Sequence, residues 1–413
     1  MQSVKNISLS LCLQIVLLTG VAEALSLQGT VDTIVAKHPQ RAIQQARLEG
    51  ALAARDAARA PLLPTILGDA SVQYTKQSSR PLSQEVSTTL ELRQTVLDGS
   101  ALKSLVAART KVSATTLNIT RTRQTFAAEI AAAYIDAWEA LTLDSISRSN
   151  CKLLQQHTSD TRTRFEAGEL TRTDMLWAQG RLNDGYSAQL AMGQALCRAA
   201  NRLQELGCSE LPDRQMPLLR IDTEPVSDTA VIGTRPDIVA MEKEIETAQI
   251  LVLSRKWQNV PSISGFARAG YSIDRLTAIN EAGLHLNIPV IAGGQRTAAI
   301  HSAVSVCKES SARRELLVAS ALRELRDSRL SVNIEQQSLS LAAERDSIAQ
   351  LVLEGTTEEF KAGTRTIQDA HDAQNELFIA HQALVQQQAT LLRAIISLRL
   401  ASGTLDINKM EDR

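Results

Sequence analysis

The placement of proline is the feature that most limits how this chain can fold. All ten prolines lie within residues 39–81 or 212–289, so residues 82–211 and 290–413 contain none. Because a proline inside a helix costs about 3 kcal/mol, two long proline-free stretches predict very long helices. Residues 100–164 as a single helix would measure about 100 Å, at about 1.5 Å per residue, which is too long for a compact domain.

Apolar residues recur in both proline-free stretches with the spacing of packed antiparallel helices. In the second stretch, leucines recur every seven residues and alanines follow three of them: Leu377, Leu384, Leu391, Leu398, Ala380, Ala394 and Ala401. The first stretch has a similar seam, formed by Phe126, Ile130, Ala133, Ala137 and Leu141. Because a generic coiled coil would show the same pattern, the seams alone predict no function.

The chain contains an internal repeat with a period of roughly 195 residues. FEAGELTRTDMLWAQ, which begins at Phe165, corresponds to FKAGTRTIQDAHDAQ, which begins at Phe360. Two further pairs are LLPTILGDASVQY with NVPSISGFARAGY, and LRQTVLDGS with LNIPVIAGG. Each half therefore contains a helix, two short extended pieces, a long helix, a glycine turn and another long helix. We expect a first repeat at 25–211, a proline-rich linker at 212–234, and a second repeat at 235–413, with hairpin turns near Gly168 and Gly363.

Each repeat is expected to contribute two strands, in which apolar and polar residues alternate. The predicted strands are at about 65–75, 84–96, 261–272 and 281–291. Each has about the length that a tilted membrane strand needs, although a half-buried soluble sheet would alternate in the same way. Four strands cannot close a barrel, and open sheet edges are not tolerated in lipid. Membrane strands would therefore require several copies of the chain to share one barrel.

The N-terminus has the pattern of a secretory signal peptide. Lys5 precedes the apolar run LSLCLQIVLLTGVA, and Ala22-Glu23-Ala24 is a small-x-small cleavage site. We expect residues 1–24 to be removed; a membrane anchor is the alternative, but the run is short for a span. With 44% apolar and 22% charged residues, the chain as a whole is too polar for a bundle of membrane helices. A net charge of −1 gives no indication of nucleic-acid binding.

Four cysteines follow the signal and are expected to remain unpaired. Cys151 lies 17 residues before Gly168, and Cys197 lies 29 residues after it. On antiparallel helices this difference corresponds to an axial offset of about 18 Å, whereas a disulfide tolerates only about 7 Å between Cα atoms. Cys208 and Cys307 lie at other levels, and none of the four forms a CxxC pattern.

Taken together, these features resemble the TolC family of outer-membrane efflux proteins, over essentially the whole chain after the signal. The most specific matches are the turn motifs AGELTRTDMLWAQ and AGTRTIQDAHDAQ and the junctions VLDGS and IPVIAGG. The resemblance implies a mostly α protein with a small membrane β part. In such a homotrimer, long antiparallel coiled-coil helices form an α-barrel that extends into the periplasm. Four strands from each of three protomers make one twelve-stranded β-barrel in outer-membrane lipid.

The function implied by the resemblance is that of a channel protomer in a tripartite export system. Such a duct passes substrates from an inner-membrane transporter and a periplasmic adaptor (a membrane fusion protein) to the outside, in type I secretion, multidrug efflux or both. The hairpin tips would contact the adaptor or transporter through Gly168, Glu169, Leu170, Gly363 and Thr364. The sequence does not indicate which substrate, transporter or adaptor is used.

The resemblance also implies a pore gate at Asp369 and Asp372. These residues are three apart and therefore share a helix face. Three-fold symmetry would bring six carboxylates around the pore, where they would hold cations and repel anions. An ordinary solvated helix face is the alternative. His371 lies between them in sequence; as an exposed histidine it would have no role or would add pH sensitivity.

Arg365 and Asp174 match family positions that brace the closed gate against a neighbouring hairpin. An arginine and a carboxylate can form directional, charge-assisted hydrogen bonds. Phe360 departs from the tyrosine found at this position in the family's namesake. We therefore expect one hydroxyl-dependent bracing contact to be absent and the closed state to be held less firmly.

Motifs of catalysis are absent from the sequence. It has no GxSxG, Walker A, HExxH or paired-cysteine metal motif, and its six histidines are scattered. We expect no enzyme activity, cofactor or metal. A secreted structural coiled-coil protein without a pore is the alternative function; it would explain the apolar seams but not the duplicated strand pairs.

Overall fold

The computed structural model describes residues 26–75, 83–208, 210–212, 228–272, 277–291 and 293–405. It divides into two compact units. The hairpin unit contains residues 1–41, 123–228 and 323–413, and the sheet unit contains residues 42–122 and 229–322. Each unit therefore combines segments of both sequence repeats. The predicted signal peptide, and residues 213–227 of the predicted linker, lie outside the described residues.

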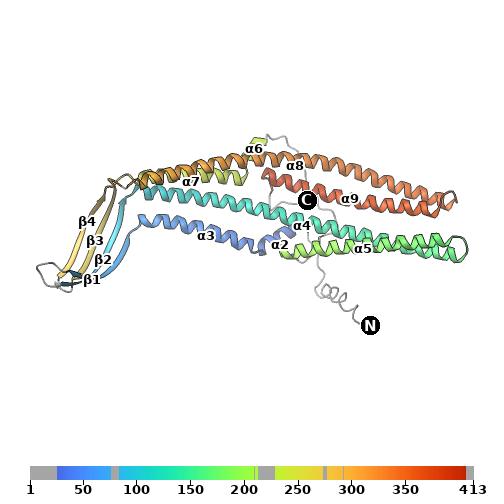
Figure 1. The fold of residues 1–413 in the computed structure, drawn as a ribbon, viewed down its shortest axis with the longest axis horizontal. Coiled ribbons are helices and arrows are strands. Elements are labelled where there is room, and N and C mark those ends of the chain that lie inside the picture. The colour runs from blue at the N-terminus through green and yellow to red at the C-terminus, as the bar shows by residue number, and fades with distance from the viewer. Residues whose placement is uncertain are drawn as a thin grey trace. The chain divides into compact units, whose positions relative to one another are not determined.

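The sheet unit contains a four-stranded antiparallel sheet in the order β1-β2-β3-β4 (Figure 1). The strands are β1 (Thr65–Thr75), β2 (Ser83–Leu97), β3 (Ser262–Ser272) and β4 (Thr277–Asn287). The first three lie where the alternating pattern predicted them. β4 begins and ends four residues before the predicted range, because its Asn287 pairs with Ser262, the first residue of β3. Pro261 precedes that residue and has no N–H to extend the ladder.

The strand register gathers apolar side chains on one face of the sheet. Ile66 is opposite Leu92, which is opposite Ala267, which is opposite Ala282. Most of the large apolar side chains of this face are exposed; Ile66 is 67% exposed. Neighbouring residues along a strand point to opposite faces, so the other face receives the adjacent row of residues. The predicted alternation is thus present in the structure.

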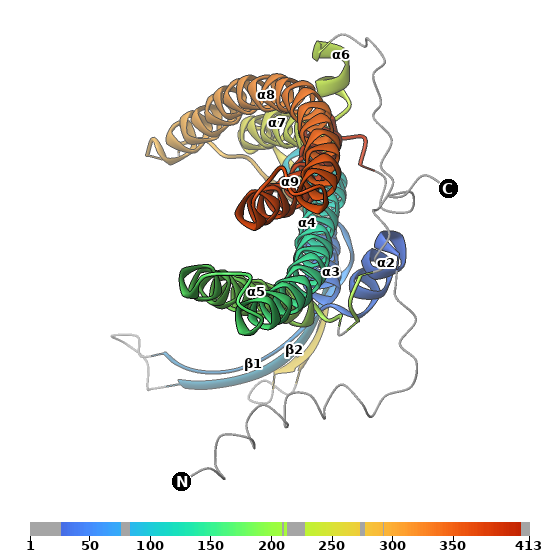
Figure 2. The same ribbon diagram turned by 90° about the vertical axis from the view of Figure 1, so that its right-hand side faces the viewer.

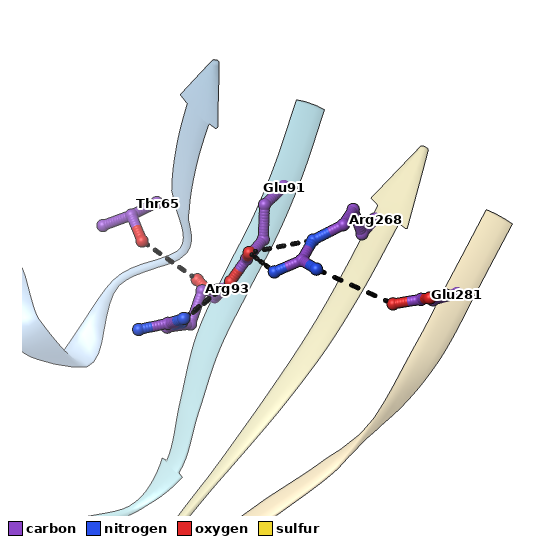
Figure 3. Close-up of polar contacts among 5 residues, drawn as sticks. All are labelled: Thr65, Glu91, Arg93, Arg268 and Glu281. Carbon is purple, nitrogen blue, oxygen red and sulfur yellow. Dashed lines mark hydrogen bonds and ion pairs between the residues drawn. The ribbon is translucent and has the colours of Figure 1, made fainter. Parts of the chain in front are cut away.

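The opposite face carries a row of charges across three strands (Figure 3). Arg268 on β3 lies between Glu91 on β2 and Glu281 on β4, with nitrogen–oxygen distances of 2.6 Å and 3.7 Å. Arg93 also donates to Glu91, at 2.7 Å. Because Glu91 accepts from two guanidinium groups, this row is nearly neutralised within the sheet.

Helices of the sheet unit flank the strands in sequence. They are most of α3 (Gln40–Arg59), η1 (Ala60–Leu62), α6 (Asp228–Gly233), α7 (Pro236–Trp257), and the first parts of α4 (Gly99–Glu166) and α8 (Gln295–Lys361). The junction motif VLDGS begins α4 with a cap, because Asp98 Oδ1 accepts from the N–H of Ala101 at 3.0 Å. Gly99 packs so closely beneath Trp257 that a Cβ would lie 2.1 Å from a ring carbon. This junction therefore requires glycine.

The hairpin unit consists of two long helical hairpins and a short helix. Its elements are α2 (Leu27–Lys37), the second parts of α4 and α8, α5 (Arg172–Leu206) and α9 (Ile367–Ser402). Figure 2 shows α5 against α4 and α9 against α8. The prediction of one continuous helix over 100–164 is confirmed by α4. Among the described residues, no helix has the length and apolarity needed to cross a membrane.

The core of the hairpin unit uses the predicted seams only in part. Ile130, Ala133 and Ala137 are buried, as are Ala380, Leu391 and Ala401. Leu377, Leu384 and Leu398 are only half-buried. All four cysteines predicted to be unpaired are free in the structure: Cys151 and Cys208 are buried, Cys307 is half-buried and Cys197 is exposed.

Candidate functional site

The two hairpin turns have the same backbone construction. Gly168 and Gly363 have φ angles of +82° and +76°, which the absence of a Cβ makes accessible. The N–H of Glu169 donates to the carbonyl of Arg164 at 2.9 Å, and the N–H of Thr364 donates to that of Glu359 at 3.0 Å. These 6→1 bonds end each helix in the manner of a Schellman motif. Both helices thus end at the glycines where the sequence predicts the turns.

The next helix of each hairpin begins with a capping box. Thr171 and Asp174 bond reciprocally at the start of α5, as do Thr366 and Asp369 at the start of α9. In each pair the carboxylate accepts from the threonine hydroxyl at 2.7 Å. These bonds lower the pKa of Asp174 and Asp369, and for Asp369 the nearby Arg365 adds to the effect. Both aspartates are therefore charged and held against their own helix ends.

Asp372, the other predicted gate residue, makes an ion pair within the same chain. Its Oδ1 lies 2.8 Å from Nη2 of Arg181 on α5, while its side chain remains 58% exposed. Arg181 also stacks over the ring of Trp177, with its guanidinium carbon 4.7 Å from the ring centroid. The first and second hairpins are thus joined through this cation. Asp372 and Asp369 share one helix face, but each has a partner within the same chain.

The predicted bracing residues also have partners close to them in sequence or space. Arg365 Nε donates to Glu359 at 2.9 Å, and Asp174 belongs to the capping box of α5. No described contact joins Arg365 to Asp174. Phe360 lies beneath the guanidinium of Arg164, whose carbon is 5.5 Å from the ring centroid, within the range of a cation–π interaction. An aromatic contact between hairpins therefore exists at Phe360 without a hydroxyl group.

His371 differs most from its predicted environment. We expected an exposed side chain, but it is only 7% exposed, and neither ring nitrogen has a hydrogen-bond partner within the described residues. His157 of α4 and Trp177 of α5 contact the ring, because α9 turns this side toward the other hairpin. Ile367, the i−4 neighbour on α9, lines a pocket together with His371. A cavity of about 150 Å³ adjoins the ring and is also lined by Arg181, Asp184 and Asn375.

The residues proposed to contact partners lie at the two turns. Gly168, Glu169, Gly363 and Thr364 are exposed, and Leu170 is half-buried. Among the described residues, no group of three or more histidine, cysteine, aspartate or glutamate side chains is arranged to hold a metal ion. The arrangement offers carboxylates, cations and exposed turns.

Sequence reasoning missed several residues that join these helices. The capping boxes were visible as Thr-x-x-Asp at both turns, immediately before long helical segments. Arg181, His157 and Arg164 had no such local signal, because their partners are distant in sequence. They could be identified only from the way α4, α5 and the second hairpin pack together.

Comparisons with known proteins agree with this architecture. The chain matches the family described as outer membrane efflux protein over residues 31–207 and again over residues 230–404. It is 27% identical over 369 residues to the outer membrane efflux protein BepC of Brucella suis, covering 86% of this chain and 80% of BepC. It is 23% identical over 425 residues to the outer membrane protein TolC of Salmonella enteritidis, covering 92% of this chain and 85% of TolC.

Solved structures include the same fold. The outer membrane protein VceC of Vibrio cholerae superposes with a TM-score of 0.78, covering 91% of this chain and 96% of VceC. The sequence identity over that match is 21%, so the likeness establishes the fold alone. The two family matches fall in the two halves of the chain, as the internal repeat predicted.

Proposed function

Because this chain belongs to the outer membrane efflux protein family and is an outer membrane protein, we propose that it forms a homotrimeric exit duct of a tripartite export system. Substrates enter the duct from an inner-membrane transporter and a periplasmic adaptor, and leave to the outside. The duct serves type I secretion, multidrug efflux or both.

The sheet is the observation that carries this proposal. β1 and β4 are its edge strands and pair on one side only within the described strands. One face is exposed and apolar, with Leu284 at 75% exposure. In lipid, unpaired backbone groups at an edge cost several kcal/mol each, so β1 of one copy needs β4 of another. Three such sheets make one twelve-stranded barrel with the Glu91–Arg268 row inside.

A stripe of apolar side chains on α8 supports the same assembly. The stripe comprises Leu330, Ile334, Leu341, Ile348 and Val352, which are 48–65% exposed. Their spacing of four, seven, seven and four places them on one side of a helix. A second copy of the chain, packed against this side, would remove them from water and continue the ring of helices.

The gate of the duct lies at the hairpin turns in this proposal. Asp369 and Asp372 of three protomers form a ring of six carboxylates, and Arg365 and Asp174 brace neighbouring hairpins. Asp372 is suited to this role, because its side chain remains exposed beside Arg181. Asp369 keeps its charge through its cap. A ring of fixed negative charge would bind cations at a narrow entrance.

Assembly and conduction test the duct directly. Mass measurement in detergent should give three chains, migration in gels should change on heating, and purified protein should conduct in planar bilayers. A folded monomer that extracts without detergent and does not conduct would instead support a structural coiled-coil protein without a pore.

Partner contact is tested at the exposed tips. A photocrosslinking residue placed at Glu169 or Thr364 should capture the adaptor or transporter in cells. The same residue at Glu354, which is exposed on α8 before the turn, is the matched control. Equal capture from all three positions would place the contact elsewhere on the helices.

A further inference from the structure

The ring of His371 is enclosed by three helices of the hairpin unit. His157 of α4 lies edge-on to it, with ring centroids 4.8 Å apart, and Trp177 of α5 lies edge-on at 5.9 Å. His371 itself belongs to α9. The ring therefore lies where the first hairpin meets the second. Any movement that separates α9 from α4 and α5 would expose it to water.

The groups that face this ring from each helix are mixed in charge. α4 contributes His157, with Asp160 close enough to act on it; α5 contributes Arg181, Asp184 and Asp174; α9 contributes Asp372 beside the ring. None of these carboxylates accepts a hydrogen bond from His371: neither ring nitrogen has a partner within the described residues. A proton added to the ring would thus be a buried charge without a hydrogen-bond acceptor.

We propose that the contact of His371 with His157 and Trp177 is a proton-sensitive latch, which holds the two hairpins together at neutral pH and releases them on acidification. Protonation of His371 places a cation beside His157 and near Arg181, and protonation of His157 places a cation beside His371. The separated state allows water to solvate that cation. That the release opens an export duct rests on the proposed function; the release itself concerns packing within one protomer.

The direction of the pH dependence follows from the two states of the ring. The pKa of His371 is lowered from 6.5 to about 4, mainly by burial and further by the nearby His157 and Arg181. Burial also lowers the pKa of His157. A ring exposed by separation would titrate near its ordinary 6.5. The packed state is therefore favoured fully above pH 6.5 and loses that advantage as the pH falls toward 4. Between pH 7 and pH 5 the equilibrium should shift toward separation by roughly twentyfold.

Hydrogen exchange of the assembled protein in detergent tests the latch. After correction for the intrinsic pH dependence of exchange, amides of residues 368–374 should lose protection by up to roughly twentyfold between pH 7 and pH 5. His371→Gln should remove this pH dependence and His157→Gln should reduce it. His301→Gln is the matched control, since His301 is an exposed histidine on α8. Unchanged protection in the unsubstituted protein, or the same loss in His371→Gln, would overturn the latch.

Planar-bilayer recording distinguishes a failed latch from a failed duct. The latch in a working duct predicts that conductance rises at pH 5 in the unsubstituted protein and not in His371→Gln. Conductance without a pH-dependent loss of protection would refute the latch and leave the duct intact. Loss of protection in a protein that never conducts would support the latch and refute the duct. Heat-modifiable migration of each variant verifies that it has assembled.

Discussion

Arg181 of α5 and Asp372 of α9 are joined by an ion pair of 2.8 Å, which links the two helical hairpins of one chain. Arg181 is about one-third exposed and Asp372 more than half exposed. An exposed pair of this kind contributes only about 0.2–1 kcal/mol to stability. We therefore expect the ion pair to act on the equilibrium between packed and separated hairpins. A free-energy difference of this size changes the ratio of the two populations severalfold.

Replacing Arg181 should loosen this link. We expect Arg181→Gln to raise single-channel conductance, and Asp372→Asn in the same background to add little more to that rise. Thermal unfolding of the two single variants and the double variant should give a coupling free energy of about 1 kcal/mol or less. Arg313→Gln, which removes an exposed ion pair with Glu309 on α8, is the control. Unaltered conductance in Arg181→Gln would show that other contacts close the duct.

The gate carboxylates should be separable by their response to cations. Asp372→Asn should weaken block by multivalent cations from the periplasmic side, because the field of the ring falls. Adding Asp369→Asn should weaken block further but also disturb the cap of α9, since Asp369 bonds Thr366. Variants of Asp369 should therefore also lose some folding stability, whereas the loss of a freely solvated carboxylate would not change it.

Asp174→Asn is the matched control for the cap. Asp174 holds the position in the capping box of α5 that Asp369 holds in the capping box of α9. Its replacement should disturb a cap in the same way but leave cation block intact. Arg365→Ala should raise conductance by loosening the closed state while the cation site remains. If the double aspartate variant is blocked like the unsubstituted protein, the gate lies elsewhere.

The sequence predicted the elements of this fold better than their side-chain partners. The proline positions and the repeat predicted where α4, both glycine turns and three strands lie. These elements could be predicted because helix breaking by proline and the alternation of apolar and polar residues depend on the local sequence alone. The end of β4 required knowledge of its partner, since Asn287 pairs with the first residue of β3. Local pattern could not supply that register.

The same limit applies to the candidate site. Spacing showed that Asp369 and Asp372 share a helix face, but the partner of Asp372 is 191 residues away in sequence. His371 was expected to be exposed because it lies between two aspartates, whereas the helix turns it toward the other hairpin. The rotation of α9 about its axis is set by packing against α4 and α5.

Thiol reactivity should follow burial of the four cysteines. Denatured protein that has lost residues 1–24, and with them Cys12, should show four free thiols, because none of the remaining cysteines is bonded. In the folded protein, Cys197 should react first, while Cys151 and Cys208, which are 3% and 4% exposed, should be protected. Timed labelling followed by peptide mass analysis measures this order. Two free thiols after denaturation would reveal a disulfide and a different helix register.

Two glycines near the second turn should respond to alanine with opposite signs. Gly363 has a φ of +76°, where an alanine is strained by about 1–2 kcal/mol. Gly355 is exposed within α8 and has ordinary helical backbone, and a Cβ added there would meet no atom within 4 Å. Replacing a helical glycine of this kind by alanine stabilises by about 0.8–1 kcal/mol.

Gly363→Ala should therefore lower the Tm and Gly355→Ala should raise it, although the two sites are only eight residues apart and the added atom is the same. Gly363→Asn should lie between the unsubstituted protein and Gly363→Ala, because asparagine tolerates the left-handed region better. Thermal unfolding followed by circular dichroism in one detergent measures all three. A Tm that rises for Gly363→Ala would mean that the turn does not require a positive φ, and that the hairpin ends in another way.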